Sequence, residues 1–170
     1  MVDIQCVWKE PAILGEGPLW VARENAVYWV DIVSKKVYRY GVADDTRRAW
    51  MYEAGVTSLA ERRQGGLVGT VRDGFAFIDL ESGIFMPIVM PEADMPENRF
   101  NDGKVDENGR YWAGTMDDGE KLETGSLYRL DGDLTLHKLD AVLGGDLKEL
   151  VGALREHDTE VRLAFQAEHS

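Results

Sequence analysis

The sequence predicts an all-β protein built from repeated four-stranded units, as in a β-propeller. Apolar residues recur at every second position in short runs, which is the period of a half-buried strand. Turn residues separate these runs, and the same order of runs and turns occurs three times. Corresponding runs begin near Tyr28, Leu67 and Tyr111, a spacing of about 40 residues that is usual for propeller blades.

Each of the three units contains four predicted strands. The first unit comprises residues 5–10, 17–22, 27–32 and 37–42. The second comprises residues 48–53, 57–62, 67–71 and 75–80. The third comprises residues 85–90, 102–106, 111–116 and 126–131. Residues 134–139 then predict the first strand of a fourth unit. A β-sandwich made of similar short strands is the alternative fold.

After residue 140 the apolar pattern changes from the period of a strand to that of a helix. Asp146, with Glu149 three residues later, is a plausible N-terminal cap. The apolar stripe of this helix consists of Leu147, Leu150, Val151 and Leu154. We therefore divide the chain into a partial propeller, residues 1–140, and a divergent, helical tail, residues 141–170.

The composition limits the classes of partner. The chain has 19 Lys and Arg against 31 Asp and Glu, a net charge of −12, which disfavours nucleic acids and anionic membrane surfaces. Small molecules and metal cations are the expected partners. No run reaches the roughly 20 apolar residues of a membrane span, and the opening MVDIQCVWKE lacks the apolar core of a signal peptide. We expect a cytoplasmic protein whose one cysteine, Cys6, is buried in a strand.

A carboxylate near the N-terminus lies among residues that control the backbone. Glu16 stands between Gly15 and Gly17 and is followed by Pro18, just before an apolar run. One interpretation is a solvated turn before a strand. The other is a carboxylate directed into a cavity, where its oxygens suit a hard cation.

A second polar motif, NRFNDG, contains an arginine and an amide two residues apart. In an extended segment Arg99 and Asn101 point to the same side, so they could donate hydrogen bonds to the oxygen atoms of one ligand. The alternative is a surface arginine beside an Asn-Asp-Gly turn, in which Asp102 acts as a cap.

Three motifs in order, LGEGPLW, RFNDGKVDENGRYWAGTM and GSLYRLD, resemble the N-terminal half of the SMP-30/gluconolactonase (regucalcin) family. Bacterial members of this family include sugar-acid lactonases such as xylonolactonase. The resemblance covers about residues 5–139 and implies a six-bladed propeller, of which this chain has about three blades. It also implies hydrolysis of a sugar lactone with one divalent cation, calcium, zinc or manganese, in a central channel.

The resemblance implies roles for particular residues. Glu16 matches a metal ligand, while Arg99 and Asn101 match residues that contact substrate. Glu120, in the loop DDGEKLETG, matches the place of a substrate-contacting acid in some members, and the alternative is a solvated residue of this loop. The family's other metal ligands and its general base lie beyond the resemblance, so the catalytic base is unknown.

Two classes of function therefore stay open. The first is a metal-dependent sugar lactonase, impaired if the missing half is not replaced. The second is a non-catalytic half-propeller that binds a ligand or associates with itself. Three blades leave an open face, which the tail could cover or which a second chain could close as a homodimeric ring. The third possibility is that the chain is a truncated gene product without activity.

Overall fold

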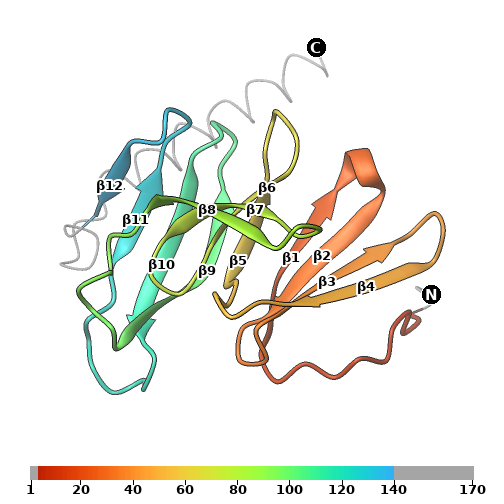
Figure 1. Cartoon of the computed structure of the whole chain (residues 1–170), viewed down its shortest axis with the longest axis horizontal. Coiled ribbons are helices and arrows are strands. Elements are labelled where there is room, and N and C mark those ends of the chain that lie inside the picture. Colours follow the sequence, from red (N-terminus) through yellow and green to blue (C-terminus); the bar gives the residue numbers. More distant parts are fainter. Residues whose placement is uncertain (1–3, 140–170) are drawn as a thin grey trace, which may run out of the picture.

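The computed structural model of the chain describes residues 4–139 and contains three four-stranded antiparallel sheets placed side by side (Figure 1). The first sheet comprises β1 (Gly15–Val21), β2 (Ala26–Asp31), β3 (Lys36–Gly41) and β4 (Thr46–Met51), with the short 3-10 turn η1 (Ala22–Glu24) after β1. The second comprises β5 (Ser58–Glu61), β6 (Leu67–Thr70), β7 (Phe75–Asp79) and β8 (Ile84–Val89). The third comprises β9 (Asn98–Val105), β10 (Tyr111–Asp117), β11 (Leu127–Leu130) and β12 (Leu136–Lys138).

The structure confirms the four-stranded repeat and corrects its boundaries by one strand. Residues 5–10 do not form the predicted strand, and Cys6 is exposed rather than buried. Residues 134–139 do not open a fourth unit, because β12 pairs with β11 and completes the third sheet. Alternating apolar residues identify a strand but not its partner, and each sheet here is a meander in which consecutive strands pair. The helix predicted for residues 141–170 lies outside the described residues.

The middle sheet is packed on both faces. Its first face meets the first sheet in a cluster that includes Val30, Val37 and Leu67. Its second face meets the third sheet, where the rings of Phe75 and Phe100 lie 5.0 Å apart and edge to face. Two apolar interfaces thus join the three sheets.

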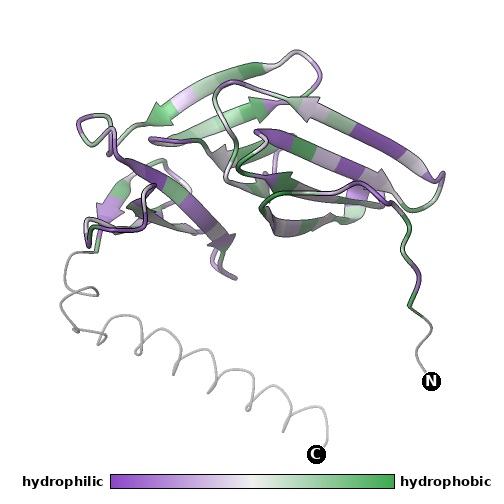
Figure 2. Ribbon diagram, turned by 90° about the horizontal axis from the view of Figure 1, so that it is seen from below, coloured by the Kyte–Doolittle hydropathy of each residue, from purple (hydrophilic) through white to green (hydrophobic). Residues whose placement is uncertain are grey.

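The outer faces of the first and third sheets carry aromatic side chains. Apolar and hydrophilic residues alternate along much of the ribbon (Figure 2), so residues next to core positions point outward. On the first sheet, Trp29 stacks on Tyr38 at 5.1 Å, and Trp8 packs edge-on against both rings. Trp20 is 50% exposed on the same sheet. On the third sheet, Trp112 lies between two arginines.

The first strands of the three sheets, β1, β5 and β9, lie close to one another (Figure 1). The Lys104 amino group donates to the Pro18 carbonyl at 3.4 Å, linking β9 to β1. The Ser58 hydroxyl of β5 lies 2.7 Å from the Tyr111 hydroxyl of β10. Within residues 4–139, no helix has the length and apolarity needed to cross a membrane.

Candidate functional site

The start of β1 carries Glu16 on a distorted strand. The pairing of β1 with β2 shifts its register between Glu16 and Leu19, which marks a β-bulge. Gly17 lies in this bulge with φ +58°, a left-handed conformation that favours glycine. Glu16 is partly buried, and its carboxylate has no hydrogen-bond or ion-pair partner among residues 4–139. The bulge shows where Gly17 is needed, and the role of the Glu16 carboxylate stays a prediction.

Asp31 fixes the segment that leads into Glu16. Its carboxylate is buried and accepts hydrogen bonds from the backbone N–H groups of Ile13 (2.9 Å), Leu14 (3.1 Å) and Ser34 (3.1 Å). Burial alone would raise the pKa of Asp31, but hydrogen bonds from Ser34, Ile13 and Leu14 outweigh it and lower the pKa to about 2. Sequence reasoning missed this residue, because an aspartate at the end of an apolar strand reads as an ordinary turn residue.

Asn101 lies in a bulge of β9, and Arg99 lies in the regularly paired part of the strand two residues before it. The register between β9 and β10 shifts between Ala113 and Thr115, so that Asn101 and Asp102 fall in the distorted part of the strand. The two side chains do reach the same side, since Arg99 Nη1 donates to Asn101 Oδ1 at 2.9 Å. Asp102 accepts from the N–H of Gly103 at 2.8 Å, a local cap within a strand and not the predicted turn.

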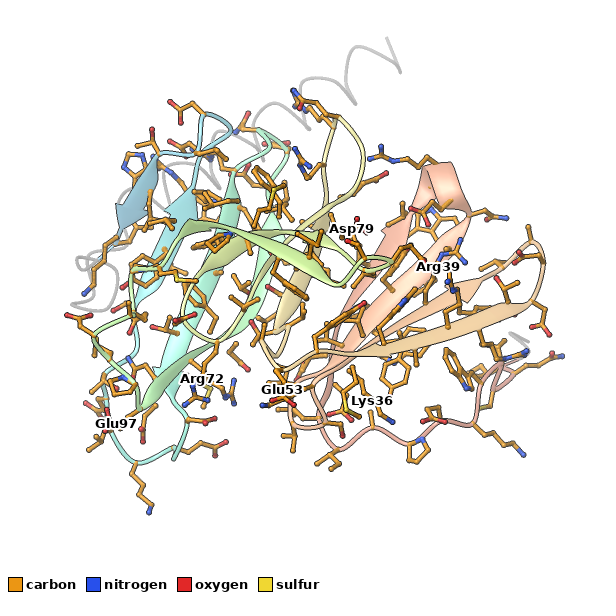
Figure 3. The ribbon with its side chains drawn as sticks, in the orientation of Figure 1. Lys36, Arg39, Glu53, Arg72, Asp79 and Glu97 are labelled. Carbon is orange, nitrogen blue, oxygen red and sulfur yellow. The ribbon has the colours of Figure 1, made fainter. Side chains whose placement is uncertain are left out.

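The guanidinium of Arg99 is held by a carboxylate that sequence reasoning did not single out. Arg99 Nε donates to Asp118 Oδ1 at 2.7 Å, and Arg72 Nη1 donates to Asp118 Oδ2 at 3.0 Å. The hydrogen bond from Arg72, and then that from Arg99, lower the pKa of Asp118 despite its partial burial. Figure 3 places Arg72 and Glu97 toward the lower edge of the view, and the N–H of Asp118 donates to the Glu97 carbonyl at 2.8 Å.

Glu120 lies in the exposed loop after β10, two residues beyond Asp118. It has φ +55°, and its N–H donates to the Asp117 carbonyl at 3.0 Å. The carboxylate of Asp117 accepts from the N–H groups of Lys121 and Leu122 and so fixes the loop. The structure therefore brings Arg99 and Asn101 together with Asp118, while Glu120 is placed on the loop above and does not join their hydrogen bonds within the described chain.

A buried carboxylate holds the start of β9 in place. Glu92 accepts hydrogen bonds from Asn98 Nδ2 (2.8 Å), Thr115 Oγ1 (3.1 Å) and the Tyr128 hydroxyl (2.7 Å). These donors come from three strands of the third sheet, so one side chain ties the strands together just before Arg99. Glu92 precedes β9 in the segment PEADMPEN, where nothing in the sequence pattern marks it as buried.

Glu16 has the donor chemistry of a divalent-cation ligand. An unpartnered, partly buried carboxylate such as Glu16 fits one oxygen ligand of a hard cation. Residues 4–139 contain no group of three or more His, Cys, Asp and Glu side chains arranged to hold a metal ion. Glu16 therefore fits one ligand of a cation site, and the described acidic, histidine and cysteine side chains do not complete that site.

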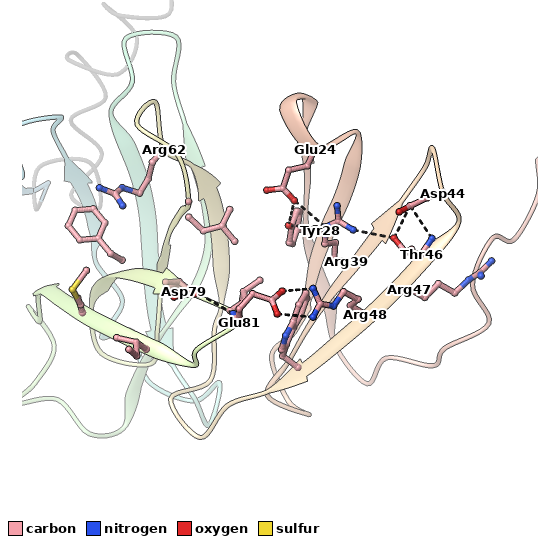
Figure 4. Close-up of a pocket in the computed structure, with 18 residues that line it drawn as sticks. Glu24, Tyr28, Arg39, Asp44, Thr46, Arg47, Arg48, Arg62, Asp79 and Glu81 are labelled. Atoms are coloured by element: carbon pink, nitrogen blue, oxygen red, sulfur yellow. Dashed lines mark hydrogen bonds and ion pairs between the residues drawn. The ribbon is translucent and has the colours of Figure 1, made fainter.

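A cleft lies between the first and second sheets, away from Glu16 and Arg99 (Figure 4). Its volume is about 970 Å³. A bidentate ion pair between Arg48 and Glu81 bridges the two sheets across it, with one contact of 2.7 Å. Arg39 pairs with Glu24, so much of the positive charge in the cleft is already neutralised. We regard this cleft as an ion-paired surface between neighbouring sheets.

Comparison with known proteins gives a consistent result. Residues 14–145 match the model of the SMP-30/Gluconolactonase/LRE-like region. Regucalcin of Gallus gallus is 39% identical over 133 residues, which are 78% of this chain and 44% of that protein. The 6-deoxy-6-sulfogluconolactonase of Pseudomonas putida is 31% identical over 144 residues, 85% of this chain and 48% of that protein. The chain thus spans about half the length of these relatives.

Solved structures share the fold. A calcium-binding regucalcin from Agrobacterium tumefaciens superimposes with a TM-score of 0.73 at 25% identity, covering 78% of this chain and 45% of that one. A gluconolactonase from Xanthomonas campestris gives a TM-score of 0.61 at 25% identity, covering 75% and 47%. The three sheets therefore correspond to part of a regucalcin-type β-propeller, and the chain belongs to the SMP-30/gluconolactonase/LRE-like family.

Proposed function

We propose that this chain provides half of a divalent-cation-dependent sugar-lactone hydrolase, in which Glu16 is a ligand of the cation. Arg99 and Asn101 bind the lactone, and Glu120 approaches it from the loop after β10. One observation supports this most strongly: the first strands of the three sheets lie together, and two of them have a bulge next to an unpartnered carboxylate or an arginine–amide pair. Relatives named as lactonases support the same reaction class.

The proposed reaction is the hydrolysis of a lactone to a sugar acid. Water adds to the lactone carbonyl carbon, the ring C–O bond breaks, and the ring oxygen takes up a proton, so that a neutral lactone becomes a sugar acid. Glu16 would hold a divalent cation in part, and such a cation would supply Lewis acidity for polarising the carbonyl. The catalytic base of this reaction is not assigned to any described residue.

Arg99 and Asn101 are preorganised donors for the oxygens of the lactone. Three N–H groups of Arg99 donate to Asp118, to the Phe100 carbonyl and to Asn101 Oδ1, so the two on Nη2 are left for a ligand. Because Asn101 Oδ1 accepts from Arg99, its amide N–H groups can donate to a sugar hydroxyl. A fixed arrangement of donors reduces the entropy lost when the lactone binds.

Calcium is the first cation to test, ahead of zinc and manganese. Carboxylate and other oxygen ligands suit a hard cation, and the structural relative from Agrobacterium is described as calcium-binding. A single carboxylate binds such a cation weakly, so tight stoichiometric binding requires that the remaining ligands are supplied.

The test is hydrolysis of xylono- and gluconolactone at constant pH, by protein stripped with chelator and then resupplied with calcium, zinc or manganese. Turnover that returns with a cation and is lost in Glu16→Gln supports the proposal. Asp133→Asn, in the turn before β12, removes one negative charge elsewhere and should retain turnover. Absence of cation-restored turnover with every metal would refute the lactonase.

A second, non-catalytic function is self-association, favoured by the aromatic residues on the outer faces. Trp20 is half exposed on the first sheet, and Trp112 lies on the third sheet. Large exposed aromatic residues are typical of interaction surfaces, and a homodimer that closes a ring would bring a second Glu16 to the channel. The solution mass decides: a homodimer gives twice 19.1 kDa and should dissociate in Trp20→Glu, whereas a monomer at micromolar concentration refutes it.

A further inference from the structure

One carboxylate near the proposed substrate residues already occupies an anion position. Asp118 receives Arg99 Nε on one oxygen at 2.7 Å and Arg72 Nη1 on the other at 3.0 Å. Arg72 is itself oriented by a second hydrogen bond, from Nη2 to the Pro96 carbonyl at 3.0 Å. The side chain of Arg99 is 10% exposed and that of Asp118 is 44% exposed, so the carboxylate lies between the better-buried arginine and solvent.

Two guanidinium groups around one carboxylate form the arrangement that proteins use to bind carboxylate and phosphate ligands. Here the anion is part of the chain. An external carboxylate that approached Arg72 and Arg99 would have to displace Asp118, and it would meet the negative charge of Asp118 before it did so. A neutral ligand meets no such repulsion and can still use the free N–H groups of Arg99.

We propose that Asp118 is a charge-selecting residue, which occupies the anion position between Arg72 and Arg99 and so makes this site prefer neutral lactones to anionic sugar acids. The inference rests on the proposed function for its substrate class. It has a consequence for turnover, because hydrolysis converts a neutral lactone into a sugar acid that carries a carboxylate. A site already holding its own carboxylate binds that product weakly, which favours product release.

The test measures binding, so that it does not depend on turnover. Wild-type protein and Asp118→Asn are titrated with gluconate as the anionic probe and with glucose as the neutral probe, at low and high salt. Asp118→Asn should bind gluconate about five- to tenfold more tightly than wild type at low salt, and salt should reduce the gain. The affinity of Asp118→Asn for glucose should stay within about twofold of wild type, because glucose carries no charge for Asp118 to repel.

Two control variants isolate the role of the arginine pair. Asp94→Asn removes one exposed negative charge from the segment before β9, and it should leave gluconate affinity unchanged. Adding Arg72→Gln to Asp118→Asn should abolish the gain, because one of the two guanidinium groups is then missing. Circular dichroism of each variant checks that the sheets are retained.

Three outcomes would overturn the inference: gluconate affinity that is equal in wild type and Asp118→Asn, equal gains for gluconate and glucose, or gluconate binding to Asp118→Asn that stays undetectable. The proposed lactonase activity fails by a different observation, which is the absence of cation-restored hydrolysis in wild type. A wild type that hydrolyses lactones while Asp118→Asn shows no change in charge preference would refute the inference alone.

Discussion

The starts of β1 and β9 carry the two halves of the proposed site, and they are built differently. Both strands are bulged, but the segment leading into Glu16 is held through its backbone, by the carboxylate of Asp31. The start of β9 is held through side chains, with Phe100 in the apolar core. The carboxylate of the first half has no partner in the described chain, whereas the arginine of the second is fully oriented. In the proposed site, Glu16 is thus left free to bind a cation, and Arg99 and Asn101 are held in place before a lactone binds.

Among the substitutions that test this difference, removal of the Phe100 side chain should lower the stability most. Phe100 is 0% exposed and packs against Phe75 and Tyr128. Phe100→Ala should lower the free energy of unfolding by about 3–5 kcal/mol, because a buried ring is lost and a cavity is left. Urea denaturation monitored by tryptophan fluorescence measures the change. Leu14→Ala, a partly buried side chain before β1, should cost clearly less, and equal losses would contradict the distinction between the two starts.

Asp31→Asn tests how the segment leading into Glu16 is held. The substitution removes the charge that receives three backbone N–H groups, and it places an amide donor where only acceptors fit. A loss of about 2–3 kcal/mol in the free energy of unfolding is expected. Asp79→Asn is the matched control, because Asp79 accepts two backbone N–H groups from an exposed position and should cost less.

The same carboxylate predicts a dependence of stability on pH. The pKa of Asp31 is lowered from 3.8 to about 2 in the folded protein. A lowered pKa means that its contribution is complete above about pH 4 and is lost as the pH falls toward 2, a change of about 2 kcal/mol. Urea midpoints between pH 5 and pH 2 should therefore fall less in Asp31→Asn than in wild type. Parallel curves for the two proteins would show that Asp31 is not the group responsible.

Gly103 tests how closely the strand after Asn101 is packed. A Cβ atom at this position would lie 2.8 Å from Ser58 Oγ and 2.8 Å from Tyr111 Cε2. Gly103→Ala should therefore cost about 1–3 kcal/mol through overpacking. The companion variant Ser58→Gly removes one of the crowding atoms and should recover part of the loss when combined with Gly103→Ala. A Gly103→Ala protein as stable as wild type would show that β9 can move away from β5.

The sequence alone predicted the strands well and their partners less well. Alternation and turn residues located runs such as residues 67–71 and 111–116, because burial of one face leaves a period of two. The same alternation could not tell that residues 134–139 close a sheet, since pairing depends on distant contacts. Arg99 and Asn101 were recognised from their spacing, but Asp118 and Asp31 were not. The arginine partners of Asp118 lie 19 and 46 residues away, and two of the backbone partners of Asp31 lie 17 and 18 residues away. Contacts of this range have no local signature.

Gly17 provides the smallest expected effect and the most specific one. Its φ of +58° disfavours any residue with a Cβ atom, although a Cβ there would meet nothing closer than 3.7 Å. Gly17→Ala should therefore cost only about 1 kcal/mol, through conformation and not through crowding. Gly17→Asn should cost less than Gly17→Ala, because asparagine tolerates the left-handed region better. Gly103→Ala should destabilise through crowding, which an asparagine at position 103 would not relieve. Equal losses for Gly17→Ala and Gly17→Asn would therefore mean that the bulge beside Glu16 is also limited by space.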